Sequence, residues 1–164
     1  MAKSNTAIIP NETEGTTELT GLDSARIAAD AMLRAALECC HQHDRFARLV
    51  ERPALEVEHR TADELCARAT EGLAQFAETY RESANDLRLK GGPDEEWWHR
   101  ANALWHASRE FARRQTSGNG TRRSTKHDSE MLGDLVLQYD LEASALLALR
   151  HAADAYRKVR PEAW

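Results

Sequence analysis

Four stretches of the chain repeat apolar residues at the three-to-four-residue spacing of an amphipathic helix. The stretches cover residues 22–50, 61–87, 93–116 and 128–159. Pro53 and the Gly91-Gly92-Pro93 run stand between them, and both are typical of helix ends. A Thr61-Ala-Asp-Glu64 string resembles a capping box and indicates the start of the second helix. The pattern predicts four long helices with short connections.

The fourth predicted helix differs from the others because it is apolar nearly all round. Leu146 and Leu149 belong to its main seam, while Leu137 and Leu141 lie outside it. A helix of this kind is either central in its domain or covered by a partner. The economical arrangement of all four helices is an antiparallel, up-down-up-down four-helix bundle.

Composition supports a purely helical fold and sets its limits. The chain contains 27 Ala and 18 Leu against 4 Val and 3 Ile, which excludes a sheet-based domain and the chemistries built on one. Residues 22–160 are expected to form one domain. Residues 1–21 have few apolar side chains, and we expect them to be a disordered tail.

The sequence shows no membrane or export signal. It has no apolar run long enough to cross a bilayer, and the apolar run before Pro10 is only Ala7-Ile8-Ile9. Its 3 Cys do not suggest a secreted disulfide framework. A cytoplasmic location is therefore expected.

Cysteine and histidine suggest one metal site. His43 is the histidine on an apolar helix face, and Cys39 lies one turn before it. Antiparallel helices would bring Cys66 and His127 to the same end of the bundle. These four residues could then form a tetrahedral zinc site, with zinc as the only cofactor considered. Alternatively, the cysteines are small core residues and His43 is a hydrogen-bonded core histidine.

Glu142 is the second buried polar candidate, beside His43. It occupies the seam of the fourth helix, where a carboxylate needs a partner. Counting levels through the bundle places it near Arg34, Tyr80, Trp98 and Trp105. It is then either a structural hydrogen-bonding group or a general acid or base in an aromatic-lined cavity.

One segment is strongly basic. Residues 97–126 hold seven basic residues and one acid, a net charge of +6, so the rest of the −5 chain carries −11. Nucleic acid or another anion could bind there, although a solvated helix end would have the same composition. The candidate anion-binding residues are Arg109, Arg113, Arg114, Arg122, Arg123 and Lys126.

Ribonucleases of the HEPN family also combine a helical bundle with an Arg and a His a few residues apart. Arg34 and His41 have this spacing and share a polar helix face, but an arginine-rich chain supplies several such pairs by chance. The spacing is compatible with that family and does not identify it.

The sequence therefore favours a non-catalytic protein–protein interaction or scaffold module, with a homodimer as one arrangement that would suit it. The apolar fourth helix and the separation of charge motivate this prediction. A zinc-binding bundle and an RNA-binding or HEPN-like ribonuclease bundle are the alternatives. No residue is assigned a catalytic role.

Overall fold

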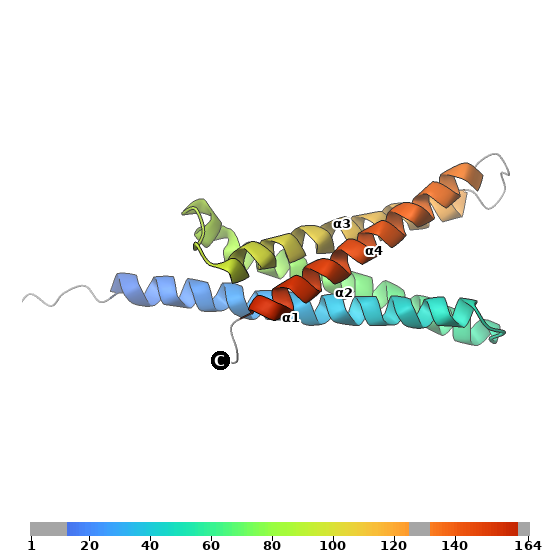
Figure 1. Ribbon diagram of the computed structural model, residues 1–164, viewed down its shortest axis with the longest axis horizontal. Coiled ribbons are helices and arrows are strands. Elements are labelled where there is room, and N and C mark those ends of the chain that lie inside the picture. Colours follow the sequence, from blue (N-terminus) through green and yellow to red (C-terminus); the bar gives the residue numbers. More distant parts are fainter. Residues whose placement is uncertain (1–12, 125–131, 161–164) are drawn as a thin grey trace, which may run out of the picture.

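The computed structural model describes residues 13–124 and 132–160, and over these residues it contains four α-helices and no strand (Figure 1). The protein is therefore all-α, as predicted. The helices are α1 (Thr13–Val50), α2 (Glu56–Leu89), α3 (Glu96–Ser124) and α4 (Leu132–Val159).

The helices pack as two hairpins, α1 with α2 and α3 with α4. Figure 1 shows that the hairpins meet where α3 begins and α4 ends, and that they diverge toward the α1–α2 turn. Polar contacts join them at the closed end. Arg26 of α1 forms an ion pair with Glu95, 3.2 Å, and the Tyr156 hydroxyl of α4 donates to Asp30 of α1, 3.0 Å. The four helices thus do not lie side by side along their whole length.

Small residues make the close helix contacts of the core. Ala29 and Ala36 of α1, Ala77 of α2 and Ala153 of α4 are all fully buried. Alanine side chains let helix backbones approach one another, and larger side chains then fill the space that remains. The largest of the fully buried side chains are Tyr80, Tyr156, Phe111, Met32 and Leu33.

The link between the hairpins is fixed by two glycines. The Gly92 N–H donates to the Leu87 carbonyl, 2.8 Å, and the Gly91 N–H donates to the Arg88 carbonyl, 3.1 Å. This is the Schellman arrangement that ends a helix, and both glycines have positive φ, 93° and 72°. A side chain at Gly92 would also overlap the Trp98 indole. The predicted end of the second helix is therefore confirmed.

Two predicted helix starts were wrong. Helix α1 begins at Thr13, nine residues before the predicted start at residue 22. Extending an existing helix adds one hydrogen bond for each residue ordered, which explains how a polar segment can join it. Helix α2 begins at Glu56, where the Leu55 N–H donates to the Glu58 carboxylate, 3.0 Å. The Thr61 hydroxyl donates to Val57 within the helix, so it caps nothing.

Helix α3 is also longer than the sequence pattern indicates. It continues to Ser124, eight residues past the predicted end at residue 116. The two extra turns shift the alignment of α4 against the other helices, with consequences for Glu142.

Candidate functional site

A cavity of about 700 Å³ opens where the two hairpins diverge. Its walls come from all four helices: the end of α1 around Phe46, the start of α2 around Cys66, the second half of α3 after Phe111, and α4 between Tyr139 and Leu146. Its lining residues on α1, and nearly all of those on α2, lie in the halves of these helices that are next to the α1–α2 turn. We call this cavity the groove.

The surface of the groove is mostly small and apolar. Five alanines line it, and three aromatic side chains stand among them. His43 meets the buried Phe111 ring edge-on, with 5.1 Å between the ring centroids. The groove is therefore shaped for an apolar surface with a few polar contacts, as binding sites usually are. The alanines are Ala47, Ala67, Ala74, Ala112 and Ala143.

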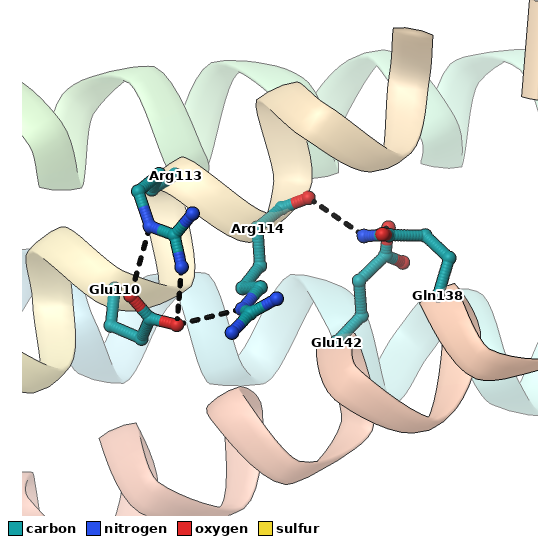
Figure 2. A network of polar contacts seen from close by, with 5 residues as sticks. All are labelled: Glu110, Arg113, Arg114, Gln138 and Glu142. Carbon is teal, nitrogen blue, oxygen red and sulfur yellow. Dashed lines mark hydrogen bonds and ion pairs between the residues drawn. The ribbon is translucent and has the colours of Figure 1, made fainter. Parts of the chain in front are cut away.

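Glu142 lies on the groove wall and is 8% exposed. Gln138, one turn earlier on α4, donates to its carboxylate, 3.2 Å, and to the Arg114 carbonyl of α3, 3.1 Å (Figure 2). The carboxylate packs directly against the backbone of Gly118, where any side chain would overlap it. Glu142 thus helps to join α3 to α4.

The predicted burial of Glu142 is confirmed, whereas the predicted surroundings were wrong. Its neighbours are Gln138 and Gly118, because the longer α3 places its last turns opposite this part of α4. The aromatic residues expected beside it lie elsewhere. Tyr80 donates to Asn102 near the start of α3, 3.3 Å. Trp105 packs against Arg88 and Arg109, which lie 4.6 and 5.1 Å from its ring centroid. Arg34 is exposed on α1.

The basic candidates are largely engaged within the protein. Glu110 accepts hydrogen bonds from Arg113, 2.9 Å, and from Arg114, 2.6 Å (Figure 2). These bonds lower the pKa of the Glu110 carboxyl, with the Arg113 contact the largest cause. Arg109 covers Trp105, as described above. Lys126 lies outside the described residues, and the structure does not describe the side chains of Arg122 and Arg123.

The predicted zinc ligands do not assemble in the described part of the chain. Within residues 13–124 and 132–160, no three His, Cys, Asp or Glu side chains are arranged to hold a metal ion, so Cys39, His43 and Cys66 form no such set. His127 lies outside the described residues.

Hydrogen bonding and burial explain why the Cys39 and Cys66 thiols keep their protons. The Thr70 hydroxyl donates to the Cys66 carbonyl, 2.8 Å, which leaves the Cys39 thiol as the donor in its 3.7 Å contact with Thr70. Burial raises the pKa of Cys39 to about 12 and that of Cys66 to about 11. Both thiols are therefore protonated at neutral pH, whereas nucleophilic chemistry needs a thiolate.

Arg34 and His41, the pair with the HEPN-like spacing, are both exposed on α1 and neither lines the groove. His43 does line it, in a position that the apolar face of α1 indicated.

The groove itself was not predicted. Its only signal in the sequence is a set of small residues, Ala67 and Ala74 of α2 and Ala143 of α4, beside the expected apolar seams. A helical-wheel projection cannot distinguish small residues that face a neighbouring helix from small residues that face an opening. Both patterns are apolar and periodic.

Comparisons with protein families, with curated proteins and with solved structures found no match to this chain. None of the helices, over the residues described, has the length and apolar character needed to cross a bilayer.

Proposed function

We propose that this chain is a non-catalytic protein-interaction module, an antiparallel helical bundle that receives a helix of a partner protein in the groove. The observation that carries the proposal is an open, alanine-lined groove between two diverging helical hairpins. Small wall residues allow a helix to approach closely, as they do between the helices of the core.

Exposed apolar side chains extend the groove at both edges. Val50 lies one turn beyond Phe46 on α1, and Val136 lies two turns before Ala143 on the same face of α4. These valines are 62% and 59% exposed. Apolar side chains that gather on a surface next to a cavity commonly mark a protein-binding site.

The walls of the groove favour a helix over an extended segment as the occupant. All four walls are helices whose backbone groups bond within the helix, so they offer no strand edge to a partner. An extended peptide would bury unpaired N–H and C=O groups in an apolar groove, which is costly. A helix satisfies these groups internally and presents side chains at positions i, i+3, i+4 and i+7.

A tryptophan substitution tests the proposal. Ala143 and Ala148 are both exposed on α4, and of the two only Ala143 lines the groove. The probe is a fluorescein-labelled peptide of roughly five helical turns with leucine anchors on one face and glutamine on the other. We expect fluorescence anisotropy to show binding that Ala143→Trp weakens about tenfold or more, a loss of at least about 1.4 kcal/mol.

The matched variant Ala148→Trp should bind like the unmodified chain. If Ala143→Trp leaves binding of every amphipathic helical peptide unchanged, or if no such peptide binds, the proposed function is wrong.

A further inference from the structure

We infer that the helix bound in the groove is basic, with Lys or Arg along its polar side. This inference rests on the proposed function and specifies the chemistry of the partner. Asp63, Glu71 and Glu142 all line the groove, and among its described lining residues there is no Lys or Arg. The groove thus combines an apolar surface with negative charge only, counting His43 as neutral.

The two acids on α2 have a regular spacing. Asp63 and Glu71 are eight residues apart, with Ala67 midway between them, so they lie along one side of the helix about 12 Å apart. Both are exposed, and in the described part of the chain neither forms an ion pair. Two basic residues seven or eight positions apart on a partner helix would match this spacing.

Three arginines on the neighbouring helices are bound to acids of their own. Glu110 holds Arg113 and Arg114 on α3 (Figure 2). Asp44 of α1 holds Arg150 of α4, 2.8 Å. None of these arginines lines the groove. The charges of Asp63 and Glu71 are therefore left for a partner, and the same charges would repel nucleic acid phosphates.

Aromatic side chains add a second attraction for basic residues. Tyr139 of α4 is half-exposed and Phe46 of α1 is partly buried, and both line the groove. The methylene stems of Lys and Arg can cover such rings while their charged ends reach the carboxylates at the edge. A basic amphipathic helix would thus use both the apolar and the acidic parts of the site.

The test compares three labelled peptides that share the same leucine face and carry lysine, glutamine or glutamate on the polar face. The full chain is used throughout, and anisotropy is measured at low and at high salt. We expect the lysine peptide to bind about tenfold tighter than the glutamine peptide at low salt, and the glutamate peptide to bind most weakly. The difference should shrink at high salt because exposed charges are screened.

A pair of double variants locates the effect. Asp63→Asn/Glu71→Gln should reduce the preference for lysine over glutamine to about threefold or less at low salt. The matched control Glu64→Gln/Glu82→Gln removes the same charge from exposed positions of α2 that do not line the groove, and it should keep the full preference.

The outcomes separate the two proposals. If the glutamine peptide binds as tightly as the lysine peptide and both respond to Ala143→Trp, the groove binds helices without regard to charge and this inference is wrong. Equal effects of the two double variants would also overturn it, since they would reveal a general charge attraction. Loss of the Ala143→Trp response for all three peptides instead overturns the proposed function.

Discussion

At the scale of single residues, close packing limits substitution most at a glycine whose backbone touches a charged side chain. Gly118 of α3 is buried against the Glu142 carboxylate, and that carboxylate is held by Gln138. Gly72 of α2 is also helical, yet nothing lies within 4 Å of a side chain added there. Two glycines in similar local conformations therefore have opposite tolerance to substitution.

We expect Gly118→Ala to lower the free energy of unfolding by about 1 kcal/mol net. The overlap with Glu142 costs typically about 1–3 kcal/mol, and the better helix propensity of alanine offsets about 1 kcal/mol of this. Gly72→Ala should raise the free energy of unfolding by about 0.5–1 kcal/mol. Urea denaturation of both variants measures the difference, and an equal gain in stability for both would contradict the packing of Glu142.

At the scale of elements, the sequence predicted which helices exist better than where they begin. The apolar periodicity identified all four, and Trp97, Leu104 and Phe111, which follow one side of α3, are buried. The predicted helix ends were less accurate because neighbouring residues can each supply a helix cap. Thr61 looked like a cap, but Glu58 three residues earlier reaches the Leu55 N–H, so the helix begins a turn and a half sooner.

The competing caps give a direct test. Glu58→Ala should lower the free energy of unfolding by about 0.5–1 kcal/mol, because it removes a capping hydrogen bond and a negative charge from the first turn of α2. Thr61→Ala should leave stability unchanged or raise it slightly, since Thr61 lies inside the helix. Chemical denaturation of the two variants distinguishes them, and a larger loss for Thr61→Ala would restore it as the cap.

The surroundings of the candidate site depend on the length of α3, which the local pattern of apolar residues does not determine. His43 and Glu142 could be selected from the sequence as polar residues on apolar faces, and both line the groove. Their surroundings could not, because an error of two turns in the length of α3 changes every partner of α4. The opening itself follows from the angle between the hairpins, which arises from contacts such as those of Arg26 with Glu95 and Tyr156 with Asp30.

At the scale of the whole molecule, burial raises the pKa of several thiol and tyrosine groups, so stability depends on pH in the alkaline range. Burial raises the pKa of Cys39, Cys40 and Cys66 above the ordinary value of 9.0, and it raises those of Tyr80 and Tyr156 above 10.0. The unfolded chain loses these protons first, so between the two sets of pKa values the folded state binds more protons. The stability that these groups contribute is complete below pH 9.0 and declines as the pH rises.

We therefore expect the urea midpoint, measured under reducing conditions, to fall steadily from about pH 9 to pH 11. The Cys39→Ala/Cys66→Ala variant should show a shallower fall over the same range, because two of the groups that cause it are absent. A midpoint that does not change up to pH 11, or an equally steep fall in the variant, would show that the thiols are not buried as described.

The glycine link between the hairpins has a mechanical consequence. Gly91 and Gly92 join two stiff pairs of helices at one end, and the Trp98 indole packed on Gly92 limits how that joint can turn. From the core near Met32 to the tip at Val50, α1 acts as a lever arm of about 27 Å. A rotation of about 10° at the joint would move the tips by about 5 Å, roughly the rise of one helical turn. Packing of the Trp98 indole on Gly92 thus contributes, with the Arg26–Glu95 and Tyr156–Asp30 contacts, to the aperture at the far end of the molecule.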